Sequence, residues 1–199
     1  MNLPNKISLT RIFMIPVFLV LFFLDGVLPY NYLISAVVFA LTACTDFVDG
    51  HIARSRNLVT NIGKFLDAIA DKVLVSTVMV VILTMKSTFF AFFGRAETAV
   101  YIAVCVSICI ILAREFLVSA FRQIAASKGV IMAAEKLGKY KTAFQDVALF
   151  LMLFAVDFSN TFGMVTAYVA LAFFLIATIL TVVSGVNYVV KNKQVLKED

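Results

Sequence analysis

Residues 168–183 read YVALAFFLIATILTVV, and residues 73–85 read VLVSTVMVVILTM. Neither stretch alternates polar with apolar residues, as the strands of a membrane β-barrel do. Both stretches therefore predict helices that are apolar around most of their circumference. With its flanks, each run approaches the roughly 20 residues that an α-helix needs to cross a hydrocarbon layer about 30 Å thick.

The composition extends this interpretation to the whole chain. Of the 199 residues, 62% are hydrophobic and only 15% are charged, and 20 residues are Phe. The mean hydropathy is +1.01. Because roughly half of a soluble domain is apolar, a soluble fold of this length could not bury so much apolar side chain. The sequence predicts an all-α integral membrane protein.

Turn-forming and charged segments divide the chain into six predicted transmembrane helices. We expect the first one to remain as a helix rather than to be removed as a signal peptide, because no small-residue cleavage pattern follows it. The preceding residues, MNLPNKIS, are expected to lie along the inner membrane interface. Residues 1–199 are taken as one membrane domain. The predicted spans are 10–27, 31–54, 62–86, 97–125, 140–157 and 161–190.

The distribution of basic residues predicts the orientation, since cytoplasmic loops carry an excess of Lys and Arg. With the N-terminus inside, only Lys86 and Arg95 fall in outer loops. Six spans then place both termini in the cytoplasm. The net charge of +5 is explained by this asymmetry and by attraction to anionic lipid headgroups, and no nucleic-acid motif is present. The cytoplasmic side holds Lys6, Arg11, Arg54, Arg56, Lys64, Arg114, Arg122, Lys128, Lys136, Lys139, Lys141, Lys191, Lys193 and Lys197.

Four aspartates occur between apolar runs, in the segment 46–72, DFVDGHIARSRNLVTNIGKFLDAIADK. Asp46 and Asp49 are spaced i, i+3 near the end of the second predicted span, and Asp67 and Asp71 are spaced i, i+4 near the start of the third. Such spacings place each pair of carboxylates on one helix face. A short linker makes the two helices antiparallel neighbours, so the acidic faces can oppose each other near the inner membrane surface.

A carboxylate at membrane depth costs roughly 2.5–3.5 kcal/mol on insertion scales, and several close together repel one another. A hard divalent cation relieves both costs, and Mg²⁺, Mn²⁺ or Ca²⁺ suits an all-oxygen ligand set better than Zn²⁺ does. Two such ions form a common clamp for phosphoryl chemistry. Two alternatives stay open at this point: aspartates paired with basic residues for structural reasons, and the ion pathway of a cation or proton transporter.

The residues around these aspartates resemble the signature of the CDP-alcohol phosphotransferase family. Asp46-x-x-Asp49-Gly50-x-x-Ala53-Arg54, eight residues, Gly63-x-x-x-Asp67-x-x-x-Asp71 matches that signature at every fixed position, and the six-span plan is similar as well. The resemblance implies an enzyme that transfers a substituted phosphate from a CDP-linked donor, usually CDP-diacylglycerol in bacteria, to an alcohol and releases CMP. It also implies a homodimer.

The resemblance implies a role for each residue of the motif. Asp46, Asp49 and Asp67 would hold one Mg²⁺ or Mn²⁺ ion, and Asp46, Asp67 and Asp71 would hold a second. Asp71 would also be the general base that takes the proton from the attacking hydroxyl. Thr60 has an equally good explanation as a helix cap. The implied donor-binding residues are Gly50, Ala53, Arg54, Thr60 and Gly63.

Basic residues of the fourth and fifth predicted spans indicate the acceptor. Arg114 lies inside the fourth span, and a buried arginine needs an anionic partner. Glu115 is adjacent but is expected on another helix face, so a phosphate monoester is the better candidate, since guanidinium groups bind phosphate oxygens in pairs. The alternative for each basic residue is an anchor whose charge reaches the membrane interface. The predicted phosphate ligands are Arg114, Arg122, Lys139 and Lys141.

Two further stretches are similar to the bacterial phosphatidylglycerophosphate synthases, a branch of this family. They are PNKISLTRI near the start, and Arg114-Glu115 followed by Gly138-Lys139-Tyr140-Lys141-Thr142. The similarity implies transfer of the phosphatidyl group of CDP-diacylglycerol to sn-glycerol 3-phosphate by direct displacement, giving phosphatidylglycerol phosphate and CMP at the cytoplasmic face of the cell membrane. Inositol phosphate, serine or another alcohol stays open as the acceptor, and a transporter stays a distant alternative.

Overall fold

The computed structural model describes residues 3–55, 61–127, 136–158 and 160–192, with side chains described for 9–45, 69–125, 137–158 and 160–192. Each predicted span corresponds to an α-helix, and no β-strand occurs among the described residues. The helices are α1 (Leu3–Phe23), α2 (Asn31–Ser55), α3 (Asn61–Ile82), α4 (Glu97–Ser127), α5 (Lys136–Val156) and α6 (Thr161–Lys191), with a 3₁₀ segment, η1 (Phe90–Ala96), before α4.

The predicted boundaries differ from the structure by four residues at the ends of α1 and α3 and at the start of α5, and two differences are larger. α1 already begins at Leu3, so residues from Leu3 onward continue the first helix and do not form a separate interfacial segment. The segment 90–96, predicted as an outer loop, forms η1 and buries its aromatic rings. Phe89 packs edge-on against Phe90, with ring centroids 5.2 Å apart, and against Phe93, at 5.7 Å. Burial of such a large aromatic surface orders the segment.

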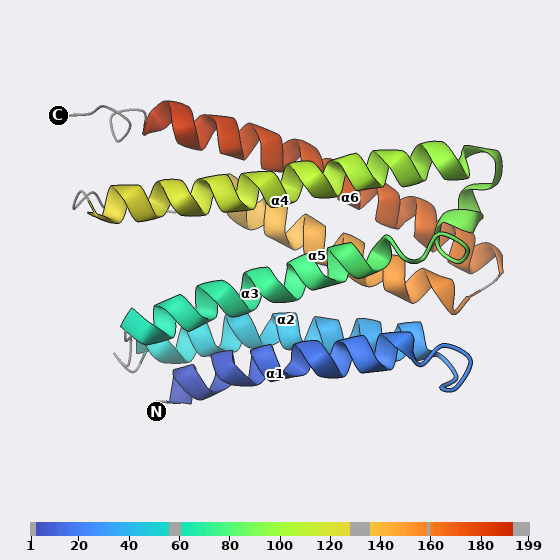
Figure 1. The fold of residues 1–199 in the computed structure, drawn as a ribbon, viewed down its shortest axis with the longest axis horizontal. Coiled ribbons are helices and arrows are strands. Elements are labelled where there is room, and N and C mark those ends of the chain that lie inside the picture. The colour runs from blue at the N-terminus through green and yellow to red at the C-terminus, as the bar shows by residue number, and fades with distance from the viewer. Residues whose placement is uncertain (1–2, 56–60, 128–135, 159, 193–199) are drawn as a thin grey trace.

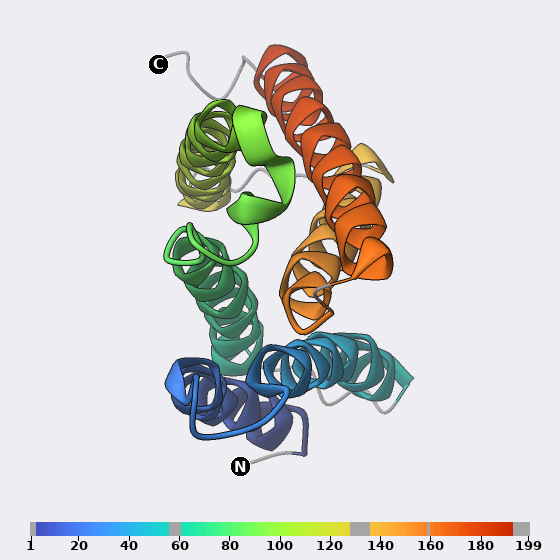
Figure 2. The ribbon, with the colours of Figure 1, turned by 90° about the vertical axis from the view of Figure 1, so that its right-hand side faces the viewer.

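Successive helices run in opposite directions along a common axis (Figure 1). α1, α3 and α5 begin at one end of the bundle, and α2, α4 and α6 end there. We call this end the N-end of the bundle, because α1 starts at it. Figure 2 shows α1, α2 and α3 grouped on one side and α4 and α6 on the other, with α5 lying between α2 and α6. The contacts agree, since α5 packs along α6 and also against α2 and α3.

A continuous apolar core runs through the bundle and joins all six helices. Phe18, Phe39, Val78, Leu149 and Phe174 are each at most 1% exposed. Between them lie small residues, which let helix backbones approach closely where lipid provides no hydrophobic driving force between helices. The fully buried alanines are Ala36, Ala70, Ala125, Ala148, Ala155, Ala167, Ala170 and Ala177.

Polar residues fix the helix ends opposite the N-end. The Asn160 side chain accepts hydrogen bonds from the N–H groups of Phe162 (3.1 Å) and Gly163 (3.2 Å), so Asn160 is the N-cap of α6. A carboxylate oxygen of Asp157, just beyond α5, accepts from the N–H of Leu33 in the first turn of α2. Asp157 therefore caps a helix 124 residues away in sequence and ties α5 to α2.

The outer surface of the bundle is apolar. α4 with its preceding η1 segment (Phe90–Ala125) and α6 (Thr161–Lys191) are each long and apolar enough to cross a membrane. Their outward side chains include Phe116, Leu117 and Ile179, each more than 60% exposed. Exposed apolar surface of this extent is unfavourable in water but is solvated by hydrocarbon. This is the surface of a membrane protein.

Candidate active site

The four aspartates lie on two helices at the N-end of the bundle. α2 carries Asp46 and Asp49 in its last three turns, and α3 carries Asp67 and Asp71 in its first three, so the expected helical spacing is present. Their ligand roles stay predictions, because the side chains of Asp46, Asp49 and Asp67 lie outside the described residues. The same holds for the donor-binding candidates: Gly50, Ala53, Arg54 and Gly63 lie on these helices without described surroundings, and Thr60 lies outside the described chain.

Asp71 is the aspartate of this motif whose side chain is described, and it is half-buried. Among the described side chains, no group of three or more His, Cys, Asp or Glu could hold a metal, as expected when the other three carboxylates lie outside that set. The donor set that α2 and α3 carry here consists of carboxylate oxygens, which fits Mg²⁺ or Mn²⁺. Asp71 has the position and the chemistry to take part.

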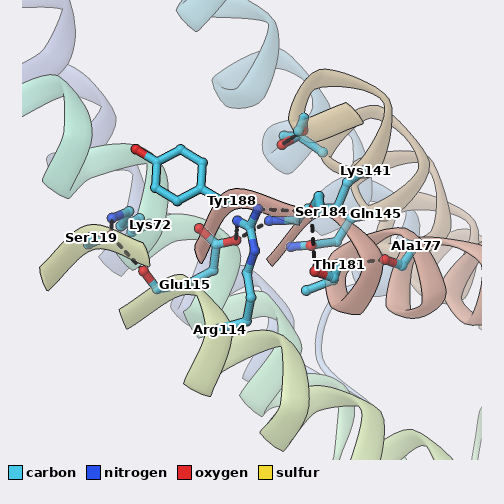
Figure 3. A network of polar contacts seen from close by, with 12 residues as sticks. Lys72, Arg114, Glu115, Ser119, Lys141, Gln145, Ala177, Thr181, Ser184 and Tyr188 are labelled. Atoms are coloured by element: carbon cyan, nitrogen blue, oxygen red, sulfur yellow. Dashed lines mark hydrogen bonds and ion pairs between the residues drawn. The ribbon is translucent and has the colours of Figure 1, made fainter. Parts of the chain in front are cut away.

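Two cationic side chains from different helices share one carboxylate beside this region. Arg114 on α4 places its Nη1 atom 2.9 Å from Oε1 of Glu115, and the Nζ atom of Lys141 on α5 contacts the same oxygen. Lys141 is only 4% exposed. Figure 3 shows the three side chains pointing toward one another from α4 and α5. The expectation that Glu115 is a poor partner for Arg114 is therefore wrong.

Arg114 and Glu115 can form this ion pair because both side chains are long. Neighbouring residues on a helix leave the backbone about 100° apart, but the several rotatable bonds of Arg and Glu allow their charged ends to meet. Lys141 favours this position of the Glu115 carboxylate, because its buried ammonium group needs an anion at the same place. Unit charges 4 Å apart interact by about 4 kcal/mol at an effective dielectric constant of about 20. Without Glu115, the like charges of Arg114 and Lys141 would repel each other.

The Arg114 side chain packs against α6 and forms a hydrogen bond to it. The Arg114 Nη2 atom donates to Oγ of Ser184 at 2.9 Å, and Ser184, 1% exposed, donates in turn to the carbonyl of Thr181 at 3.2 Å. The Arg114 side chain also crosses directly over Gly185. A Cβ atom at residue 185 would lie 2.9 Å from Arg114 Cγ, too close for ordinary packing. Arg114 is thus held by Glu115 on its own helix and by the surface of α6 at Ser184 and Gly185.

The acceptor-side cations and the metal-side helix are connected. Asp71 is one of the charged groups that act on the Lys141 ammonium group, with a smaller effect than Glu115 or Arg114. Lys72, the next residue on α3, donates to the Ser119 hydroxyl on α4, and that hydroxyl donates to the backbone carbonyl of Glu115 at 2.6 Å. α3 is therefore fixed against α4 where Glu115 stands. The helix that carries the proposed base is thus bonded, through Lys72, to the helix that carries Arg114 and Glu115.

The structure brings together only two of the four predicted phosphate ligands. Lys139 is exposed. Arg122 is also exposed, and its Nε atom donates to the hydroxyl of Tyr188 at 3.2 Å while its guanidinium carbon lies 5.6 Å from the centre of that ring. Arg122 is thus engaged with an aromatic residue of α6, two turns along α4 from Arg114. Arg114 and Lys141 are the pair that the fold assembles.

A family profile for the CDP-alcohol phosphatidyltransferases matches residues 1–193. The chain belongs to the CDP-alcohol phosphatidyltransferase family. It is 35% identical over 206 residues to a protein of Bacillus subtilis strain 168, with 98% of this chain and 97% of that protein covered. It is 36% identical to a protein of Rickettsia bellii (94% and 93% covered) and 32% identical to one of Salmonella typhimurium (94% and 92% covered).

All three relatives carry the name CDP-diacylglycerol–glycerol-3-phosphate 3-phosphatidyltransferase. The family assignment confirms the resemblance inferred from the aspartate motif. The name of these relatives specifies glycerol 3-phosphate, a phosphorylated alcohol, as their acceptor.

Several small or buried polar residues at the N-end of the bundle were not predicted to belong to a site. Ser184 and Gly185 interrupt the apolar sequence of α6, and such small residues in a membrane helix could have indicated close packing. Gln145 lies one turn after Lys141 on α5, is 3% exposed, and its Oε1 atom has no hydrogen-bond partner among the described residues. Arg11 on α1 is 1% exposed; in the sequence it counted only as one of many basic residues.

Proposed function

We propose that this protein transfers the phosphatidyl group of CDP-diacylglycerol to sn-glycerol 3-phosphate, forming phosphatidylglycerol phosphate and releasing CMP. The observation that carries the choice of acceptor is a pair of cations, the partly buried Arg114 and the buried Lys141, that share the Glu115 carboxylate. Membership of the family and the names of the relatives support the donor and the reaction type.

The geometry suggests how the acceptor would lie. Its phosphate would take the remaining N–H groups of Arg114 and Lys141, since each terminal guanidinium nitrogen carries two N–H groups and the ammonium group carries three. Its reacting hydroxyl stands at the other end of a three-carbon chain and would point toward α3. There the Asp71 carboxylate would accept the hydroxyl proton as the oxygen attacks the donor phosphorus. Uncharged alcohols could not use both cations.

Asp46, Asp49, Asp67 and Asp71 would hold two Mg²⁺ or Mn²⁺ ions. Bound there, the ions would neutralise charge that develops on the pyrophosphate and make CMP a better leaving group. Gly50, Ala53, Arg54, Thr60 and Gly63 are the proposed contacts for the donor. The phosphatidyl group would pass directly from donor to acceptor, because no nucleophile–base pair has been identified beside the aspartates.

The helix arrangement supports a six-span topology within one domain, in the cell membrane. Six helices of alternating direction place the start of α1 and the end of α6 at the same end of the bundle, and α4, α5 and α6 carry Arg122, Lys139 and Lys191 toward that end. By the inside rule for basic residues, the N-end, with the active site and both termini, would face the cytoplasm. A homodimer is proposed from the family resemblance alone.

The decisive experiment uses purified protein in detergent micelles with CDP-diacylglycerol and Mg²⁺. Glycerol 3-phosphate, glycerol, inositol phosphate and serine are each added, and CMP release is measured. Release that depends on glycerol 3-phosphate, with phosphatidylglycerol phosphate as product, is the expected result. A preference for serine or inositol phosphate would replace the proposed acceptor, and cation flux in vesicles without CMP release would replace the enzyme by a transporter.

A further inference from the structure

We propose that Glu115 and Gly185 are positioning residues, which hold Arg114 and Lys141 in the arrangement that binds the acceptor's phosphate. This inference rests on the function proposed above. Neither residue would touch the reacting atoms. Glu115 acts on the charged ends of both cations (Figure 3). Gly185 acts on Arg114 alone, because it leaves room for the arginine side chain to cross α6.

The contacts of Glu115 leave the cations free to bind a second anion. A single carboxylate atom, Oε1, contacts both Arg114 Nη1 and Lys141 Nζ. This uses one N–H of a guanidinium that has five and one of an ammonium that has three. With Nη2 bonded to Ser184, the guanidinium plane is fixed at two points. The remaining N–H groups on Nη1 and Nη2 of Arg114 therefore point in directions set by the protein before any ligand arrives.

Gly185 explains why the arginine can reach this position. The Arg114 side chain lies across the surface of α6, so that a Cβ atom on residue 185 would be 2.9 Å from its Cγ and 3.4 Å from its Nε. Cγ is not the flexible end of the side chain, so a methyl group there displaces the entire guanidinium. Gly185 lies within the regular helix α6, where the backbone conformation accepts a side chain. The requirement for glycine at 185 therefore comes from the path of the Arg114 side chain.

The charges at this site predict the direction in which KM for glycerol 3-phosphate changes when Glu115 is neutralised. Two cations and one carboxylate leave one excess positive charge, whereas a phosphate monoester carries between one and two negative charges at neutral pH. If Glu115 merely competed with phosphate for the cations, its neutralisation would tighten acceptor binding. If Glu115 positions the cations, neutralisation lets them repel each other and separate, and acceptor binding weakens. The two roles predict opposite changes in KM.

The experiment compares wild-type protein with Glu115→Gln, which keeps the size of the side chain and removes its charge. Steady-state kinetics are measured in micelles with Mg²⁺, varying glycerol 3-phosphate and CDP-diacylglycerol in turn. We expect KM for glycerol 3-phosphate to rise about 10-fold, as for loss of a charge-assisted contact, with donor KM nearly unchanged and kcat reduced less than KM is raised. An unchanged or lower acceptor KM overturns the positioning role, as does an equal loss for both substrates.

Gly185→Ala provides a second test that does not depend on Glu115. It should raise KM for glycerol 3-phosphate in the same way, whereas Val186→Ala, the neighbouring exposed position on α6, should not. In an Arg114→Ala background, Gly185→Ala should add nothing, because its only proposed effect passes through that arginine. Additive effects would show that Gly185 acts elsewhere and would overturn its assignment.

The outcomes separate this inference from the proposed function. If wild-type protein releases no CMP with glycerol 3-phosphate, the function itself fails. If the wild type is active but both variants bind the acceptor normally, only the positioning role fails. The rise in melting temperature that glycerol 3-phosphate causes in the wild type provides a measure independent of turnover. That rise should shrink in Glu115→Gln and Gly185→Ala and persist in Val186→Ala.

Discussion

Replacing Arg114 by alanine is the most informative single change at the acceptor site. The structure gives this side chain an ion pair with Glu115 and a hydrogen bond to Ser184, each at 2.9 Å, and leaves donors for a phosphate. Loss of one charge-assisted contact costs on the order of 1.5–3 kcal/mol, which corresponds to roughly a 10- to 150-fold increase in KM for glycerol 3-phosphate.

The upper part of that range is expected here. Once Arg114 is absent, Glu115 keeps its contact with Lys141, so the remaining cation is neutralised by protein and attracts phosphate less. Arg114→Lys should fall between wild type and alanine, because an ammonium group keeps the charge but cannot bond Glu115, Ser184 and phosphate with one rigid plane. The donor KM should change little in both variants.

The assay is CMP release in detergent micelles at saturating CDP-diacylglycerol, with the glycerol 3-phosphate concentration varied. Arg122→Ala is the matched control, since Arg122 lies two turns further along α4 and contacts Tyr188 of α6. It should alter acceptor KM by less than about threefold, as expected for an exposed, screened charge. An unchanged acceptor KM in Arg114→Ala, or an equal change in Arg122→Ala, would refute the reasoning and favour serine or an uncharged alcohol.

Three further outcomes are expected. EDTA should abolish CMP release, and Asp46→Ala, Asp49→Ala or Asp67→Ala should each do so without loss of the folded protein by size-exclusion chromatography; full turnover in metal-free buffer would contradict the metal site. Asp71→Asn should lower kcat more than it raises acceptor KM, because it removes the base; an acceptor-only effect in the same kinetics would argue against that role. Asp157→Ala should reduce stability by about 0.5–2 kcal/mol through loss of the α2 cap, measured as a lower thermal midpoint with acceptor KM unchanged.

The helices could be predicted because their cause is local. Apolar runs without alternation, ended by turn residues, predict membrane helices whatever their neighbours, and the predicted 31–54, 97–125 and 161–190 lie within one or two residues of α2, α4 and α6. The error at 90–96 has a tertiary cause. Phe90 and Phe93 pack against other aromatic rings in the fold. No local sequence pattern in 90–96 indicates that these two rings are buried.

The candidate site also has a part that could be predicted from local sequence and a part that depends on tertiary packing. Motif spacing on two adjacent helices was enough to select Asp46, Asp49, Asp67 and Asp71, and with them the family. It was not enough to choose among Arg114, Arg122, Lys139 and Lys141, because all four are basic residues near inner helix ends. Only packing decides which of them are buried and which lie at the surface.

The sequence by itself determined an all-helical membrane protein, the number and order of its long helices among the described residues, and the aspartate motif of its family. These follow from hydropathy and helical period, which are properties of short segments. The tertiary structure decided that Arg114, Glu115 and Lys141 share one site, with Gly185 beneath the arginine. Residues 114, 141 and 185 meet only because α4, α5 and α6 pack together, and helix–helix packing depends on the shapes of all the facing side chains at once.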